Sequence, residues 1–125
     1  MRLFLMDASA LVKRYAIEAG TPLLNHLFAQ VNPARLLCLT LGVAEVAATL
    51  ARKRNRGDIT SAAYSLAMRA LYSEVLRGGP VKLPADDHLI LRSLPLSDRH
   101  SINATDAVVL QTALEFGSRA SQQRR

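Results

Sequence analysis

Residues 3–15 read LFLMDASALVKRY, an apolar run that ends at one acid, Asp7, and passes directly into small residues. The run over residues 3–6 is short and continuously apolar, which is typical of a strand buried on both faces of a sheet. Ser9 is a residue type that caps helices, and we expect a helix over about residues 10–20. The pattern therefore predicts a strand, a turn at Asp7 and a helix.

The alternation of short apolar runs and helical patterns continues along the chain. Further strands are predicted at residues 36–41 and 81–83, and helices at about residues 21–31, 42–56, 60–77, 89–94 and 105–117. Strands separated by helices predict right-handed crossovers and a parallel sheet covered on both faces. The expected class is α/β, in three layers (α/β/α). Such sheets carry their sites at the carboxyl ends of the strands, where Asp7 lies.

Length and composition limit the classes of protein to consider. A chain of 125 residues, 50% of them hydrophobic, has the size of one domain with a single core. A net charge of +6 and a pI near 10.2 favour an anionic partner such as nucleic acid. Cys38 is the single cysteine, so no internal disulfide forms. With no run of about 18 apolar residues and no secretory signal, we expect a soluble, cytoplasmic protein without a membrane span.

Two further acids fall at the starts of predicted helices. The residues three and four positions after Glu45 are small, which leaves space in front of its carboxylate. The corresponding residues after Asp106 are apolar, so its side chain is expected to point toward the sheet rather than to solvent. Each acid also has a structural interpretation: Asp7 as a turn residue, Glu45 as a solvated helix charge, and Asp106 as part of a capping box with Asn103.

A site that gathers several carboxylates needs a cation, because the acids otherwise repel one another and one takes up a proton. Mg²⁺ and Mn²⁺ prefer oxygen ligands, activate a bound water and stabilise charge on a phosphoryl group. Acids without neighbouring histidine or cysteine therefore indicate phosphate chemistry rather than zinc chemistry. If the three acids meet, they predict a magnesium or manganese site.

Three segments of the sequence together resemble the successive motifs of the PIN domain family, and in particular its toxin ribonucleases of VapC type. They are MDASALVKRY (residues 6–15), TLGVAEVAATLARKRNRG (residues 40–57) and INATDAVVLQTALEF (residues 102–116). The resemblance implies a metal-dependent endoribonuclease that prefers single-stranded RNA and uses Mg²⁺ or Mn²⁺. It also implies the toxin role in a type II toxin–antitoxin pair, with a small VapB-type antitoxin as partner and a homodimer as the assembly.

Carried over position by position, the resemblance assigns roles to four residues. Asp7, Glu45 and Asp106 match the acidic metal ligands of the family and are the expected catalytic residues. Ser9 matches the hydroxyl residue beside the first acid, in the second shell of the metal.

The resemblance covers residues 1–117, which we expect to form a PIN-like domain, followed by a polar tail over residues 118–125. Family members continue past the last helix into further strands and another acid, whereas no acid follows Glu115 here. The C-terminal edge strands are therefore expected to be missing, which leaves the first strand as an exposed edge. A catalytically inactive, truncated PIN remnant that binds an antitoxin or nucleic acid is the alternative function.

A basic group follows Glu45 on the same predicted helix and consists of Arg52, Lys53, Arg54 and Arg56. These cations are expected to hold the RNA backbone, because phosphate contacts supply affinity that does not depend on sequence. The equally weighted alternative is a solvated helix end, where cations are favoured by the helix dipole. A third hypothesis is a plain nucleic-acid-binding module, whose binding would depend on this basic group and not on the acids.

Overall fold

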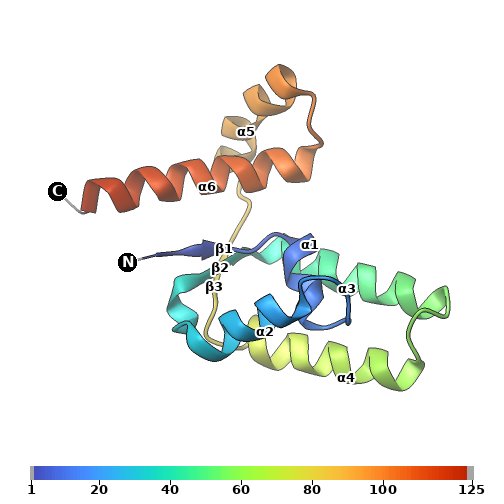
Figure 1. Cartoon of the computed structure of the whole chain (residues 1–125). Coiled ribbons are helices and arrows are strands. Elements are labelled where there is room, and N and C mark those ends of the chain that lie inside the picture. The colour runs from blue at the N-terminus through green and yellow to red at the C-terminus, as the bar shows by residue number, and fades with distance from the viewer. Residues whose placement is uncertain (1, 124–125) are drawn as a thin grey trace. The chain divides into compact units, whose positions relative to one another are not determined.

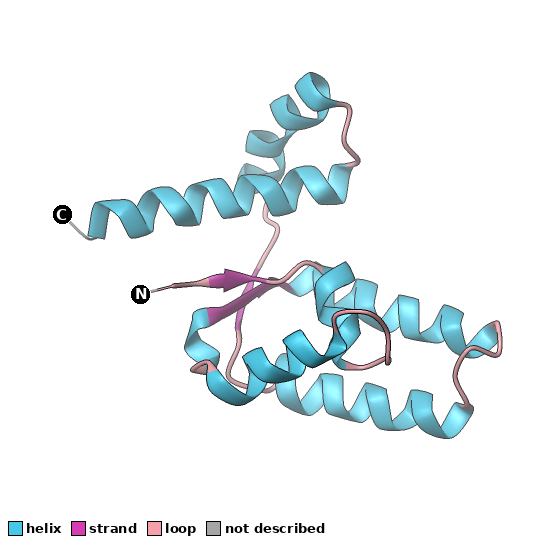
Figure 2. Ribbon diagram, in the orientation of Figure 1, coloured by secondary structure: helices cyan, strands magenta, loops and turns pink. Residues whose placement is uncertain are grey.

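The structure is a computed structural model that describes residues 2–123, with side chains described as far as residue 116 (Figure 1). The chain divides into two compact units, Met1–Pro84 and Ala85–Arg125. The first unit holds a small sheet with the helices around it, and the second is a helical hairpin (Figure 2). The fold is therefore mixed α/β and mostly helical, and each unit is described in turn.

Three short parallel strands form the sheet of the first unit, in the order β1-β2-β3. They are β1 (Phe4–Leu5), β2 (Leu36–Leu39) and β3 (Val81–Leu83). The prediction of a parallel sheet is confirmed, and β1 lies at an edge of the described sheet, as expected. Because the strands are parallel, all three carboxyl ends lie at the same end of the sheet, and Asp7 follows β1 there.

The first helix is shorter than predicted. α1 spans Ala8–Leu11 and passes into a 3₁₀ turn, η1 (Val12–Arg14), well before Gly20. The prediction that Ser9 caps this helix was wrong, because the extended residue Asp7 takes the N-cap position. Gly20, at φ 95°, then precedes α2 (Thr21–Gln30), and this left-handed conformation favours glycine.

The second crossover begins earlier than predicted. Thr40 and Leu41, expected at the end of the second strand, belong to α3 (Thr40–Asn55) after a 3₁₀ turn, η2 (Pro33–Arg35), and β2. α4 (Ser61–Leu71) packs beside α3 and is capped by Thr60, as predicted (Figure 1). It continues into a π-helical turn, η3 (Tyr72–Leu76).

Lys82 of β3 holds the segment that joins η3 to the sheet. Its ammonium donates to the carbonyl oxygens of Val75 and Pro80, both at 2.8 Å, and of Gly78 at 3.4 Å. Gly78 itself has no room for a side chain, because a Cβ there would collide with the backbone of Glu74. The tight turn after η3 therefore depends on a glycine and on the hydrogen bonds of one half-buried lysine.

One hydrophobic core lies within the first unit. Leu36 and Cys38 of β2 pack with apolar side chains of α1, α3, α4 and η3, and all four residues of β2 are buried. Phe4 and Leu5 are only half-buried, so the expectation that the first strand is buried on both faces was wrong. The fully buried members of the core, with 2% exposure or less, are Leu11, Leu36, Cys38, Val46, Leu50, Leu71 and Val75.

The second unit consists of α5 (Asp87–His100) and α6 (Ala104–Gln123), which pack on each other. The predicted end of the first of these helices at Pro95 was wrong, because α5 continues through this residue. Arg92 of α5 forms an ion pair with Glu115 of α6 at 2.7 Å. Of the predicted polar tail, residues 118–123 continue α6, and residues 124 and 125 lie outside the described residues.

Candidate functional site

Asp7 leaves the sheet at the carboxyl end of β1 with one carboxylate oxygen engaged and one free. Oδ1 accepts hydrogen bonds from the backbone N–H of Ala10 at 2.8 Å and from the hydroxyl of Ser9 at 2.9 Å. Within the described residues, no hydrogen bond or ion pair reaches Oδ2. The side chain is half-buried. Asp7 is thus both the cap of α1 and a carboxylate with one oxygen still able to bind a cation.

Glu45 lies in the second turn of α3 and is also half-buried. Its carboxylate makes no hydrogen bond or ion pair with any residue in the described part of the chain. Its backbone carbonyl accepts a bond from the Thr49 hydroxyl at 2.9 Å, so that hydroxyl is turned to the helix and not to the carboxylate. A half-buried carboxylate without a partner is a candidate cation ligand.

The sheet places the elements that carry these two acids next to each other. Leu5 pairs with Leu37, and continuing this register by two residues sets Asp7 level with Leu39, the last residue before α3. α1, which Asp7 caps, packs against α3, which carries Glu45. The structure therefore brings Asp7 and Glu45 to the same end of the sheet in the first unit.

Asp106 belongs to the second unit and does not have the orientation that the sequence predicted. Its side chain is exposed. Its Oδ2 accepts from the side-chain amide of Asn103 at 2.9 Å, and its backbone N–H donates to Asn103 Oδ1 at 2.8 Å. The prediction that Asp106 points inward from the apolar face was wrong. The alternative, a variant of the capping box at the start of α6, is confirmed.

The donor atoms of the first unit fit a hard divalent cation in type. Asp7 and Glu45 offer carboxylate oxygens alone, as Mg²⁺ and Mn²⁺ prefer. Over residues 2–123, no three side chains of His, Cys, Asp or Glu gather closely enough to hold a metal ion. The described site therefore contributes two acids, and water would complete the coordination of a bound ion.

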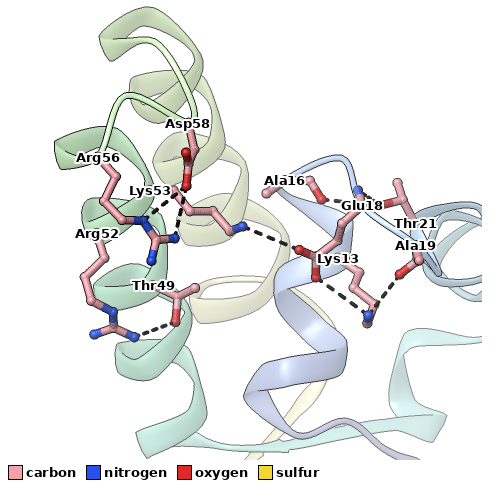
Figure 3. Close-up of polar contacts among 10 residues, drawn as sticks. All are labelled: Lys13, Ala16, Glu18, Ala19, Thr21, Thr49, Arg52, Lys53, Arg56 and Asp58. Atoms are coloured by element: carbon pink, nitrogen blue, oxygen red, sulfur yellow. Dashed lines mark hydrogen bonds and ion pairs between the residues drawn. The ribbon is translucent and has the colours of Figure 1, made fainter.

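The four cations at the end of α3 have different surroundings, and Figure 3 shows those of Arg52, Lys53 and Arg56. Arg52 is exposed and donates to the Thr49 hydroxyl at 3.0 Å, and Arg56 is exposed and pairs with Asp58 at 3.1 Å. Two others make longer-range contacts. Lys53 pairs with Glu18 at 3.5 Å, and the guanidinium of Arg54 lies 4.1 Å from the centre of the Tyr64 ring.

Glu18 is a charged neighbour that sequence analysis did not identify. It forms ion pairs with both Lys13 at 3.6 Å and Lys53 at 3.5 Å, and so ties the loop before α2 to the end of α3 (Figure 3). No local sequence pattern links Glu18 to Lys53, because the two residues are brought together by the packing of α1 and α3.

An apolar groove between α3 and α4 was also missed. It has a volume of about 320 Å³. Tyr72 and Leu76 of η3 form part of its wall and are 50% and 40% exposed. The other lining residues are Thr40, Val43, Ala44, Ala47, Met68 and Leu71. The amphipathic pattern of residues 60–77 predicts an apolar face, but nothing in it indicates that part of this face stays open.

Two titratable side chains are perturbed by burial. Burial raises the pKa of the Cys38 thiol, and the Lys82 ammonium opposes this in part. Burial raises the pKa of Tyr15 above its usual range, and the negative charge of Glu74 adds to the effect. Both groups therefore stay protonated at neutral pH, which makes Cys38 a packing residue rather than a nucleophile.

Comparison of the sequence with models of known protein families finds no match, and comparison with curated proteins finds none either. Among the helices in the described part of the chain, none has the length and apolar character needed to cross a bilayer.

Proposed function

We propose that the chain is a metal-dependent endoribonuclease of PIN type, with a three-layer PIN-like fold, and the toxin of a type II toxin–antitoxin pair. The observation that carries the proposal is that two half-buried carboxylates lie on elements that meet at the carboxyl end of a parallel sheet. Asp7 keeps Oδ2 free and Glu45 has no partner among the described residues, on elements that pack together. The motif resemblance adds Asp106 as the third acid and RNA as the substrate.

The roles of the residues follow from this geometry. Asp7 Oδ2 and the Glu45 carboxylate would hold Mg²⁺ or Mn²⁺, which supplies activation of a water and stabilisation of charge on the phosphoryl group. The bonds from Ser9 and Ala10 fix Oδ1 and so orient the Asp7 carboxylate. The cations at the end of α3 would attract the RNA backbone. A VapB-type antitoxin, a homodimer and a cytoplasmic location complete the proposal.

A cleavage assay tests the proposal. The chain is mixed with single-stranded RNA in Mn²⁺, in EDTA, and as the Asp7→Asn variant in Mn²⁺. Asp86→Asn is the matched control, because Asp86 caps α5 through the same kind of bond, from Leu89 N–H at 2.8 Å. We expect cleavage by the parent and by Asp86→Asn, and loss of cleavage in EDTA and in Asp7→Asn. Equal cleavage by Asp7→Asn and the parent would refute the proposal.

An inactive protein that binds an antitoxin or nucleic acid is the second candidate. It is favoured by Asp106, whose Oδ2 is engaged with Asn103, and by the lack of a three-acid cluster among the described residues. The apolar groove between α3 and α4 supports a binding role, since an apolar helix face of an antitoxin would fill it. A folded chain that binds RNA or the antitoxin but never cleaves RNA in Mn²⁺ would establish this candidate.

A further inference from the structure

The cations of α3 divide into two sets according to the direction in which they leave the helix. At 3.6 residues per turn, positions seven and eleven residues after Glu45 lie within about 20° of it, and the position nine residues after it lies about half a turn away. Arg52 and Arg56, the cap residue of α3, therefore share the face of Glu45, and Arg54 lies on the opposite face.

The buried side of α3 agrees with this division. Val43, Val46 and Leu50 are at most 7% exposed and anchor the helix in the core. Their directions are centred roughly 130° from Glu45 at 100° per residue. The stripe that contains Glu45, Arg52 and Arg56 is therefore on the accessible side of the helix.

Contacts agree with this division and group Lys53, which leaves the helix about 80° from Glu45, with Arg54. Arg54 stacks on Tyr64, and Lys53, with only 21% of its side chain exposed, is held by Glu18. These cations secure the packing of α3. By contrast, the Arg56 side chain is 63% exposed and, among the described residues, pairs only with its near neighbour Asp58, a surface contact that contributes little. Figure 3 shows Lys53 reaching across to Glu18, whereas Arg52 turns back along α3 to Thr49.

Thr49 links the backbone of Glu45 to Arg52, the first arginine of the stripe. Its hydroxyl donates to the Glu45 carbonyl at 2.9 Å and accepts from Arg52 at 3.0 Å. The guanidinium is thereby turned back along the helix and held at Thr49. Arg52 and Arg56 follow Glu45 by about 10 Å and 16 Å along the helix axis, at 1.5 Å per residue. A chain of anions along this face, with one of them bound to a cation that Glu45 holds, would match this line of charges.

We infer that Arg52 and Arg56 position the backbone of single-stranded RNA along α3, on one side of the phosphate that meets Glu45, and that Lys53 and Arg54 do not contact it. The inference rests on the proposed ribonuclease function for the identity of the ligand. Of the four cations at the end of α3, only Arg52 and Arg56 then bind RNA, and the bound strand follows one face of the helix.

The test is binding of a fluorescein-labelled single-stranded RNA, followed by anisotropy in EDTA over a range of salt concentrations. Arg52→Gln and Arg56→Gln are each expected to weaken binding several-fold and to reduce the slope of log affinity against log salt by about 0.7 per lost phosphate contact. Arg54→Gln is the matched control, because it removes the same charge from the opposite face. Thermal melts followed by circular dichroism verify that each variant is folded.

The outcomes distinguish this inference from the proposed function. If Arg54→Gln reduces the slope as much as Arg52→Gln, or if the folded parent does not bind the RNA, the inference is overturned. A parent that binds through Arg52 and Arg56 but never cleaves RNA in Mn²⁺ refutes the ribonuclease and leaves the inference standing. If the parent cleaves RNA while a variant with both Arg52→Gln and Arg56→Gln binds RNA as tightly as the parent, the inference is overturned and the ribonuclease function stands.

Discussion

Replacing Asp7 by alanine and by asparagine separates the structural role of this side chain from its proposed role at a metal. α1 has only four residues, and its N-cap bond runs from Ala10 N–H to Asp7 Oδ1 at 2.8 Å. Loss of such a cap costs about 1 kcal/mol. The exposed bond from the Ser9 hydroxyl adds roughly 0.5 kcal/mol. Asp7→Ala should therefore lower the free energy of unfolding by about 1.5 kcal/mol.

Asparagine retains the contacts that alanine loses. Its side-chain oxygen can accept both bonds, and Asn and Asp are about equally good caps, so Asp7→Asn should change the free energy of unfolding by less than about 0.5 kcal/mol. For a unit of this size, 1.5 kcal/mol corresponds to roughly 6 to 12 °C in Tm. The two variants therefore differ clearly in stability while both lack the negative charge.

Urea denaturation followed by circular dichroism measures these differences, with Asp86→Ala and Asp86→Asn as the same pair at the cap of α5. If Asp7→Asn is as unstable as Asp7→Ala, the side chain does not act as a neutral hydrogen-bond acceptor at the cap. The loss of stability would then come from the missing negative charge and not from a missing hydrogen bond at the cap, which would refute the explanation from cap geometry.

Three further predictions concern the packing of the first unit. Lys82→Met should lower the free energy of unfolding by about 2 kcal/mol in urea titrations, because two carbonyls at 2.8 Å lose a charged donor. Unchanged stability would mean that water replaces the ammonium. Leu50→Ala should cost about 3 kcal/mol, since Leu50 is fully buried, whereas Leu66→Ala, at a residue 65% exposed, should cost under about 0.5 kcal/mol. Cys38 should react with a thiol reagent at pH 8 only after denaturant is added, because burial raises its pKa and blocks access; prompt reaction in the folded protein would contradict this.

The strands could be predicted from short apolar runs and their parallel pairing from the helices between them, and β3 has the predicted bounds. The end of β2 could not be predicted in this way, because Thr40 and Leu41 continue the strand-like run and yet begin α3. Pro95 illustrates a different limit. It removes the N–H that would bond to the carbonyl of Leu91, yet α5 continues through it, near the exposed residue Leu91.

The candidate site shows where local rules compete. Asp7 and Ser9 are both good caps, and the extended conformation directly after β1 gives the position to Asp7. For Asp106, helical spacing predicted an inward side chain, whereas the amide of Asn103 binds its carboxylate at the surface. An acid in the first turn of a helix can either follow the helical spacing and point inward or bond to the residue that caps the helix. The sequence could therefore identify the acids as candidates without determining which of them are free to bind a cation.

We propose that Asp7 and Glu45 share one divalent cation. Titration of the folded protein with Mn²⁺, followed by the electron paramagnetic resonance of the free ion, measures this binding. We expect one Mn²⁺ site in the parent and at least tenfold weaker binding in both Asp7→Asn and Glu45→Gln, with a loss in the double variant smaller than the product of the two single losses. Parent-like affinity in both single variants would contradict it.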